Sequence, residues 1–594
     1  MDTFAHDDSL PRLPIPPLAS LCVAVPELVA PLAADDTLAD TLSALDEFVS
    51  PNGPGEVLHR ALLSYQESLG GNASWLRSLW DDMYLAWRSP LPLEMNYFFR
   101  FDTAVLGGAG ALPRLVLGLA RIAKLLGHGS LEAEKTRAGH LSMDQAQSVF
   151  YTRIPAAGTD VLAPVKLAGL RTIAVVCRGH WFIVPLSGSD GSLPTEERLA
   201  GYFMEIRRQA VKQPEAACVA ALTCAPREQA AAIRTSLLHS RVNRLSLAAI
   251  EQALLVLSLD EAHDSDTGLA MSLLAGPAAN RWFDKSLQII ATENGGLGAN
   301  MEHAGCDAGI WAYLLTQVEA LLSRTAEAGG PEKVDANAEH GQFVPQPRLL
   351  EWDIPAGIEA DLKGLQADFA NRAASLELAS HEYPSFGREE LKGFKTSPDA
   401  FLQTAFQVAQ YKIFGQLRSS YEAVSMRAFA QGRTECARSS TGSALAFAKA
   451  LESGEPEGRL RGLYRMAERN HLNRLVSCQR GKAVERYLYG LQFIYEQYGG
   501  KLGIAKTPSL FTDPGWKTVK HDALSTSGMG APCISHFGFG PVVRDGFGVG
   551  YAPRTGGCNL VVTSFKDSGL SAGSYDRAFA EAAGRIASLL SSTG

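Results

Sequence analysis

Hydrophobic positions recur with a helical period through the first ninety residues of the chain. Trp75, Leu79 and Met83 follow one another at intervals of four, which is the spacing of one face of an α-helix. We therefore expect several helices between residues 26 and 88, with the tryptophans in the core. Residues 10–18 read Leu-Pro-Arg-Leu-Pro-Ile-Pro-Pro-Leu. So many prolines exclude a helix and indicate an extended arm lying on a later element.

The rest of the chain mixes helical and strand-like patterns. A helical segment at 112–127 precedes two apolar runs, 172–177 and 180–186, which are bounded by glycine and serine turns and predict strands. The polar, turn-rich segment 325–342 is the predicted domain linker. Beyond it the pattern predicts three helices, at 359–378, 398–430 and 481–497. Glycine-punctuated strands are predicted after them, between 523 and 562.

Length and composition limit the class of protein. At 594 residues the chain is too long for one ordinary core. It is 46% hydrophobic and 20% charged, which argues against disordered and fibrous proteins. The net charge of −8 provides no basic field for nucleic acid or an anionic membrane, so we expect neither as a partner. A polyanionic ligand would need a local basic patch.

Cysteine usage and the N-terminus bear on location. The nine cysteines are odd in number and lack a CxxC spacing, which predicts reduced thiols and no metal site. The first eight residues are acidic where a secretory signal or a mitochondrial presequence is basic. No run reaches the roughly 18 apolar residues of a membrane span. We expect a cytoplasmic monomer that does not bind membranes.

Three segments carry candidate chemistry, and the first contains a histidine. His303 follows an apolar run and a glycine-rich loop, and Asp307 lies four residues further on. Histidine titrates near neutrality and can take a proton from a hydroxyl, while a nearby carboxylate can fix its tautomer. By spacing alone the two residues also fit a surface or capping pair.

The second segment is basic. Arg388, Lys392 and Lys395 precede Ser397-Pro398-Asp399, where Pro398 suits the first turn of a helix and Ser397 can cap it. Cations beside such a helix start form a local site for phosphate groups. The alternative is a solvated charged loop.

In the third segment, Ser525 and Ser527 alternate along an extended stretch, so their hydroxyls face the same side. A serine hydroxyl can donate to a developing oxyanion without being a nucleophile. No Gly-x-Ser-x-Gly elbow surrounds either serine, which disfavours an ordinary serine hydrolase. Taken alone, both also fit strand serines.

In this order the segments resemble the choline/carnitine O-acyltransferase family, closest in pattern to the carnitine acetyltransferases. Members share a catalytic histidine in Glu-His-x-x-x-(Asp/Glu), a Ser-Pro-Asp element for coenzyme A, a Gly-Arg-Thr-Glu segment, and a Ser-Thr-Ser and Phe-Gly-Pro finish. The chain carries these motifs at 302–307, 397–399, 432–435, 525–527 and 539–541. The resemblance covers nearly the whole chain.

The resemblance implies an α/β fold of two chloramphenicol-acetyltransferase-like domains with an active-site tunnel at their interface. Residues 1–91 would form an N-terminal arm and helices that pack on the C-terminal domain. Residues 92–345 would form the N-terminal catalytic domain that carries the histidine. Residues 346–594 would form the C-terminal domain with the coenzyme A and acceptor sites.

The resemblance also implies catalytic and coenzyme roles. His303 would be the general base, Asp307 the acidic residue that supports it, and Ser527 the hydroxyl that stabilises the oxyanion. Coenzyme A would be a co-substrate, with no permanently bound cofactor and no metal. Its predicted contacts are Arg388, Lys392, Lys395 and Asp399.

The acceptor positions of the family match Tyr421, Thr434, Arg486, Ser525 and Phe539. An arginine suits a carboxylate, which carnitine has and choline lacks, so we expect carnitine as the acceptor. Phe539 would pack near its quaternary ammonium.

Three further positions qualify this interpretation. Ala423 stands where the family has a serine, and Gly528 where glutamine is usual. Phe537 occupies the acyl-pocket position that is glycine in members that accept longer chains, so we expect a short acyl group.

The leading hypothesis is a carnitine O-acyltransferase that moves a short acyl group, in the first place acetyl, reversibly between coenzyme A and carnitine. One alternative is an acyltransferase to another alcohol or a polyol, such as choline or the acceptors of relatives fused to polyketide synthases. Another is a coenzyme A-binding homologue without turnover. The retention of His303 and Ser527 argues against this last alternative.

Overall fold

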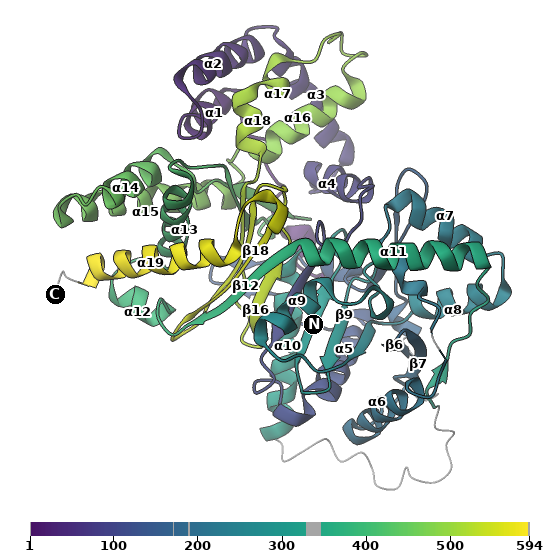
Figure 1. The fold of residues 1–594 in the computed structure, drawn as a ribbon. Coiled ribbons are helices and arrows are strands. Elements are labelled where there is room, and N and C mark those ends of the chain that lie inside the picture. Colours follow the sequence, from purple (N-terminus) through teal and green to yellow (C-terminus); the bar gives the residue numbers. More distant parts are fainter. Residues whose placement is uncertain (1, 170–171, 188–190, 215, 328–345, 592–594) are drawn as a thin grey trace.

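A computed structural model describes residues 2–169, 172–187, 191–214, 216–327 and 346–591 of the chain. It contains two large mixed sheets with helices packed against them (Figure 1). The mixed α/β fold class is confirmed. The predicted linker at 325–342 lies almost wholly outside the described residues.

The larger sheet has eight strands in the order β11-β7-β6-β8-β9-β10-β1-β16. Its central strands are apolar and buried on both faces, as expected for strands covered by helices on each side. The strands are β1 (Tyr97–Phe101), β6 (Thr172–Cys177), β7 (His180–Pro185), β8 (Val256–Asp260), β9 (Gln288–Thr292), β10 (Leu297–Met301), β11 (Arg348–Leu349) and β16 (Ile534–Phe539).

Successive residues of this sheet enter two different cores. Val175 contributes to one face and Val176 to the other, which is the alternation a strand imposes. The first core contains residues of α5 (Ala111–Gly127), α6 (Glu196–Ala210) and α10 (Ala308–Glu327). The second contains residues of α7 (Arg227–Leu237), α8 (Arg241–Glu251), α9 (Asp266–Ala275) and α11 (Ala356–Ser375).

The second sheet has six strands in the order β12-β18-β17-β15-β13-β14. They are β12 (Leu376–Tyr383), β13 (Ser420–Ser425), β14 (Thr434–Ala437), β15 (Leu524–Gly528), β17 (Phe547–Pro553) and β18 (Cys558–Phe565). Its core includes residues of α13 (Pro398–Phe414), α14 (Gly442–Glu452), α15 (Glu457–Gln479) and α19 (Ala572–Ser591), and α12 (Arg388–Gly393) precedes α13. Two hairpins complete the strands: β2 (Lys135–Thr136) with β3 (Gly139–His140), and β4 (Tyr151–Ile154) with β5 (Val161–Pro164).

The N-terminal helices share a core with helices from the far end of the chain (Figure 1). Trp75 and Leu62, for example, pack in one cluster with Tyr487. The N-terminal helices are α1 (Leu21–Val29), α2 (Asp35–Val49), α3 (Pro54–Leu69) and α4 (Trp75–Leu85), and their partners are α16 (Glu485–Tyr498), α17 (Ser509–Thr512) and α18 (Pro514–Lys520). The apolar faces of α2, α3 and α4 are thereby buried in a fourth core.

The proline-rich arm is extended as predicted. The carbonyl of Pro11 accepts a hydrogen bond from the amide of Ala430, and the carbonyl of Leu13 accepts one from the side chain of Gln66. The arm therefore fastens the N-terminus to the second half of the chain.

Two predicted helices are too long. The helix expected at 398–430 ends at Phe414, because Gly415 adopts a left-handed conformation with φ of +68° and closes the helix. Residues 420–425 then form β13. Likewise residues 376–378 belong to β12 and not to the preceding helix. In the described part of the chain, no helix combines the length and apolarity needed to cross a bilayer.

Candidate active site

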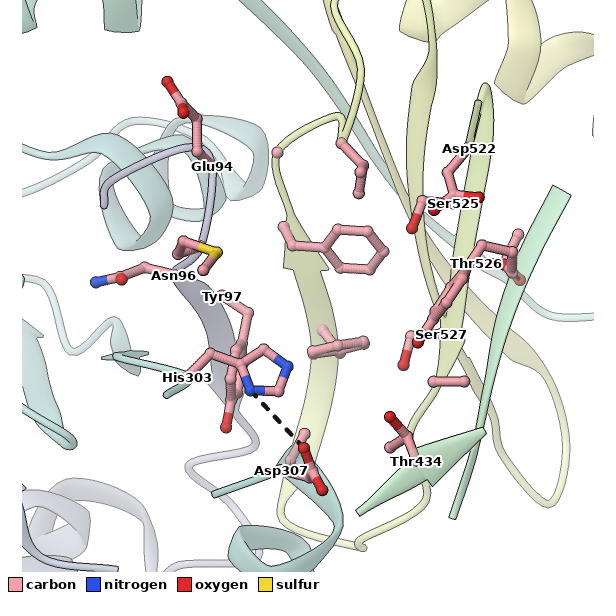
Figure 2. A pocket seen from close by; sticks show the side chains of 18 of the residues that line it. Glu94, Asn96, Tyr97, His303, Asp307, Thr434, Asp522, Ser525, Thr526 and Ser527 are labelled. Atoms are coloured by element: carbon pink, nitrogen blue, oxygen red, sulfur yellow. Dashed lines mark hydrogen bonds and ion pairs between the residues drawn. The ribbon is translucent and has the colours of Figure 1, made fainter. Parts of the chain in front are cut away.

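A cavity of about 1020 Å³ is lined by residues of both large sheets. Figure 2 shows His303 and Asp307 on one side and the serines of β15 on the other. Nine of the thirteen predicted site residues line it, which brings together positions more than 200 residues apart in sequence. They are His303, Asp307, Tyr421, Thr434, Arg486, Ser525, Ser527, Phe537 and Phe539.

His303 lies in the loop between β10 and α10. Its Nδ1 is 3.2 Å from the carbonyl oxygen of Cys306, and a carbonyl can only accept, so Nδ1 carries the proton. The neutral ring then presents Nε2 as the unprotonated nitrogen, which is the form a general base needs. The rings of Tyr84 and Tyr97 lie 5.3 and 5.1 Å from the imidazole and form its walls.

Asp307 lies beside the imidazole of His303 and is held there by Arg433 and Gln145. Its Oδ1 lies 4.0 Å from His303 Nδ1, and both its oxygens accept hydrogen bonds from Arg433, at 3.1 and 3.2 Å. Gln145 also donates to this carboxylate, at 3.0 Å. Burial disfavours the charged form, but the guanidinium of Arg433 outweighs it, and the pKa of Asp307 is lowered. A fixed negative charge therefore stands beside the imidazole.

The three hydroxyls of β15 point in two directions. Thr526 is buried, with its hydroxyl bonded to the carbonyl of Tyr421 and to the amide of Gln403. Ser525 and Ser527 line the cavity, and neither side chain hydrogen-bonds to another described residue. Figure 2 shows both serine side chains on the same side of β15 and that of Thr526 on the other, as the alternation of a strand predicts. The two serine hydroxyls are therefore available to a ligand.

Arg486 is a buried cation that the protein leaves without a carboxylate partner among the described residues. Its Nε donates to the carbonyl of Thr434 at 3.1 Å and Nη2 donates to the hydroxyl of Tyr421 at 2.9 Å. The guanidinium also lies 4.0 Å from the centre of the Trp80 ring. The other arginines of the cavity wall each form an ion pair, in the pairs Arg372 with Glu94, Arg427 with Glu134, and Arg544 with Asp567.

A second ionisable group lies behind Arg486. Burial raises the pKa of Glu435 to about 7, although the nearby Arg486 acts in the opposite direction. Its Oε1 accepts hydrogen bonds from the backbone amides of Cys436 and Arg486. At neutral pH this carboxyl is only partly ionised, so it compensates the arginine incompletely.

Aromatic rings form another part of the cavity wall. Phe537 is almost fully buried, and its ring lies 5.9 Å from Tyr97, 5.7 Å from Phe99 and 5.6 Å from Phe539. β16 pairs with β1, which sets Phe537 opposite Phe99. Phe539 is less buried and lines the cavity two residues further along the strand.

The remaining four predicted residues do not line the cavity. Lys392 and Lys395 are exposed, on α12 and just after it. Arg388 is also exposed but stands near the cavity, since its Nη2 is 3.0 Å from where a β-carbon on the lining residue Gly530 would lie. The carboxylate of Asp399 accepts a hydrogen bond from Tyr551 at 2.8 Å and lies 2.9 Å from Nε2 of His471. Ser397 caps α13 as predicted.

The structure gives a reason for one of the two departures from the family pattern. A β-carbon on Gly528 would lie 2.9 to 3.1 Å from atoms of the Tyr551 side chain, the last of them its hydroxyl oxygen. The tyrosine thus occupies the space that a larger residue at 528 would need. Ala423 lines the cavity and offers no hydroxyl there.

Several residues of the site were not predicted from sequence. Trp80 lies against Arg486 although its helical spacing indicated only core packing. Tyr84 and Tyr97 flank His303, and Gln145 and Arg433 hold Asp307. Arg433 lies within the Gly-Arg-Thr-Glu motif, so that motif contained a signal for it, but no sequence pattern states what Gln145 or Arg433 binds.

Comparison with known proteins identifies the family of the chain. Residues 13–581 match the family described as Choline/Carnitine o-acyltransferase. The chain is 31% identical to a choline O-acetyltransferase of Danio rerio, with 94% of this chain and 89% of the relative covered. It is 29% identical to a carnitine O-acetyltransferase of Rattus norvegicus (94% and 90%) and 28% identical to the mitochondrial carnitine O-palmitoyltransferase 2 of Mus musculus (94% and 89%). These relatives differ in acceptor and in acyl chain.

Proposed function

The chain belongs to the choline/carnitine O-acyltransferase family and is an O-acyltransferase, and from this premise we propose that it transfers a short acyl group, in the first place acetyl, reversibly between coenzyme A and the hydroxyl of carnitine. The proposal concerns the acceptor, the acyl chain and the residue roles, because relatives of all three specificities are about equally similar to it.

The observation that carries the proposal is the state of Arg486. A buried guanidinium without a carboxylate partner is costly, and this one faces the cavity beside Tyr421 and Thr434. A substrate carboxylate would complete the ion pair. Carnitine carries such a carboxylate next to its reacting hydroxyl, whereas choline would leave the arginine unpaired.

The rest of the cavity fits the other groups of the acceptor. Phe539 and the neighbouring aromatic rings offer faces to a quaternary ammonium. Ser525, on the facing strand, supplies a free hydroxyl for the polar end of the acceptor. Carnitine is thus held at both ends with its hydroxyl available to His303.

In the proposed reaction Nε2 of His303 removes the proton of the carnitine hydroxyl as its oxygen attacks the thioester carbonyl. The carbonyl oxygen becomes an oxyanion and accepts a hydrogen bond from Ser527, an interaction worth roughly 10²–10³ in turnover. The intermediate then collapses, the C–S bond breaks, and the leaving thiolate takes the proton from the imidazolium. No acyl-enzyme forms.

For the donor, we propose that Arg388, Lys392 and Lys395 bind the phosphates of coenzyme A. All three are exposed, and Arg388 stands beside the cavity wall at Gly530. These cations would give a chain of net charge −8 its local site for a polyanion. Asp399 stays a predicted coenzyme contact, with its carboxylate held by Tyr551.

The test is an assay of thiol release from acetyl-CoA with carnitine, choline and a polyol offered in parallel. We expect carnitine to give the highest kcat/KM. A clear preference for choline or the polyol would overturn the proposal that carnitine is the acceptor. If the protein binds coenzyme A but releases no thiol with any of the three acceptors, it is a homologue without turnover.

A further inference from the structure

The loop that carries His303 is fastened by a buried tyrosine outside the cavity. The hydroxyl of Tyr151, on β4, donates to Oε2 of Glu302 at 2.5 Å and accepts from the amide of Gly305 at 2.9 Å. It therefore bridges the residue before the histidine and the residue two positions after it. Tyr151 is fully buried and does not line the cavity.

The glycine at 305 is fitted to this tyrosine. A β-carbon at that position would lie 2.5 Å from Cε1 of Tyr151, a distance that side chains do not adopt. The ring thus packs directly on the backbone of the loop while its hydroxyl holds the amide. The same Glu302 oxygen also accepts from the amide of Ala304, at 3.0 Å, so one carboxylate and one hydroxyl fix two consecutive amides.

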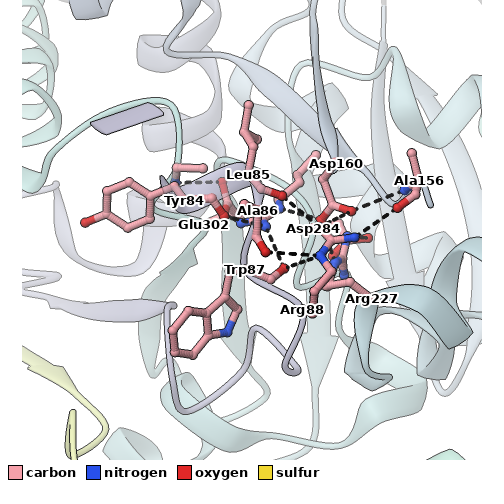
Figure 3. Close-up of polar contacts among 12 residues, drawn as sticks. Tyr84, Leu85, Ala86, Trp87, Arg88, Ala156, Asp160, Arg227, Asp284 and Glu302 are labelled. Atoms are coloured by element: carbon pink, nitrogen blue, oxygen red, sulfur yellow. Dashed lines mark hydrogen bonds and ion pairs between the residues drawn. The ribbon is translucent and has the colours of Figure 1, made fainter. Parts of the chain in front are cut away.

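Glu302 is itself held by a network of buried ions. Arg153 donates to Glu302 at 3.0 Å, to Asp160 at 2.7 Å and to the carbonyl of Tyr84 at 2.8 Å. Figure 3 labels the three residues that Arg153 contacts in this way, Glu302, Asp160 and Tyr84. Because the ring of Tyr84 packs on His303, the network fixes the histidine loop and one wall of its pocket to the same support.

We propose that the Tyr151 hydroxyl positions His303 by holding the backbone of residues 302–305, so that the imidazole stays within hydrogen-bonding distance of the substrate oxygen. Tyr151 is a positioning residue, since it touches neither the cavity nor the imidazole. The consequence for turnover rests on the function proposed above, whereas the constraint on the loop does not.

The test replaces Tyr151 with phenylalanine, which removes one oxygen and keeps the ring on Gly305. The matched control is Tyr575→Phe, because Tyr575 is also fully buried and its hydroxyl donates to a carbonyl, that of Phe406, in the core of the second sheet. We expect amide hydrogen exchange at residues 304–305, measured by mass spectrometry, to quicken in Tyr151→Phe and to stay unchanged in the control.

Turnover is the second measurement. A misplacement of about 1 Å at a reacting group can cost roughly a hundredfold in rate. The loss of one hydroxyl should displace the loop by less, so we expect Tyr151→Phe to lower kcat about tenfold with KM for acetyl-CoA and carnitine unchanged. Tyr575→Phe should keep wild-type kcat. Glu302→Gln should act on the same unit, so the double variant should lose less than the product of the two single effects.

Unchanged exchange at 304–305 in Tyr151→Phe would overturn the inference, and so would quickened exchange with a wild-type kcat. If Tyr151→Phe does not fold, Glu302→Gln decides by the same two measurements. A wild-type enzyme that is inactive with every acceptor would instead overturn the proposed function, and the exchange measurement would still decide whether Tyr151 holds the loop.

Discussion

At the scale of single residues, the proposed choice of acceptor depends on the charge of Arg486. The Arg486→Asn variant keeps a polar group but loses the charged hydrogen bonds to a substrate carboxylate, which are worth about 1.5–3 kcal/mol. We expect the KM for carnitine to rise about tenfold to a hundredfold while the KM for acetyl-CoA stays unchanged.

A second cavity arginine provides the control for this variant. Arg544 lines the same cavity but is already paired with Asp567, so Arg544→Asn should leave the carnitine KM near its wild-type value. An equal rise of KM for both substrates in Arg486→Asn would remove that arginine from the acceptor site.

Glu435 makes stability depend on pH. Its pKa of about 7 in the folded protein exceeds its ordinary value of 4.5, so the folded state holds the proton more tightly than the unfolded state. The folded protein therefore loses stability as pH rises from about 4.5 to 7. Glu435→Gln cannot ionise, and we expect it to melt close to wild type at pH 5 but to be more stable at pH 8, by a few kcal/mol at most.

Thermal melts at the two pH values check this expectation. The exposed Glu261, replaced by glutamine in the same way, should shift neither melt. A Glu435→Gln variant that is less stable than wild type at pH 8 would mean that the ionised carboxylate stabilises the fold through Arg486.

At the scale of elements, β16 sets Phe537 against the rings of Tyr97 and Phe99, and in the proposed function this ring closes the acyl pocket. Phe537→Gly removes this ring and should open a channel in the space that it fills. Each buried methylene adds only about 0.8 kcal/mol, so a steric wall, and not weak affinity, would exclude long chains in the wild type.

A panel from acetyl-CoA to palmitoyl-CoA on both proteins measures this effect. We expect the wild type to prefer the shortest chains and Phe537→Gly to gain activity on octanoyl and longer chains. A wild type that already prefers octanoyl-CoA, or a glycine variant that gains nothing, would show that Phe537 is not the barrier.

The helices and strands that were predicted correctly differ from those that were not in the length and clarity of their hydrophobic patterns. The helix at 112–127 and the strand at 172–177 were predicted almost to the residue, because their apolar periods are long and bounded by turns. The helix expected at 398–430 was wrong beyond Phe414, since alternating and helical apolar patterns overlap in a short buried strand such as β13. Cavity residues that lie in family motifs could be predicted from the sequence. Tyr151 could not, because its contacts depend on how β4 packs against the loop of residues 302–305, about 150 residues later in the chain.

At the scale of the whole molecule, the larger sheet, which is built mainly from residues before 328, includes one strand from near the end of the chain. β16, from the second part, pairs with β1 at the edge of the larger sheet. Residues 92–345 expressed alone should therefore expose β1 as an apolar edge strand, paired with β10 on one side only, and be insoluble. Fusing residues 532–541 to this fragment through a flexible linker should raise its soluble fraction, and a scrambled version of that strand should not. Equal solubility of the three proteins would contradict this expectation.

The pairing of β1 with β16 also sets the order of events during synthesis. Phe98 faces Gly538 across the two strands, about 440 residues later in the chain. A ribosome adding roughly 5–20 residues per second needs tens of seconds to reach that partner. Until then the nascent chain carries an open apolar edge, and His303, the proposed general base, emerges long before the strand that carries Ser525 and Ser527. The active site is thus among the last parts of the protein to form, and a truncated product cannot carry a premature acyltransferase activity.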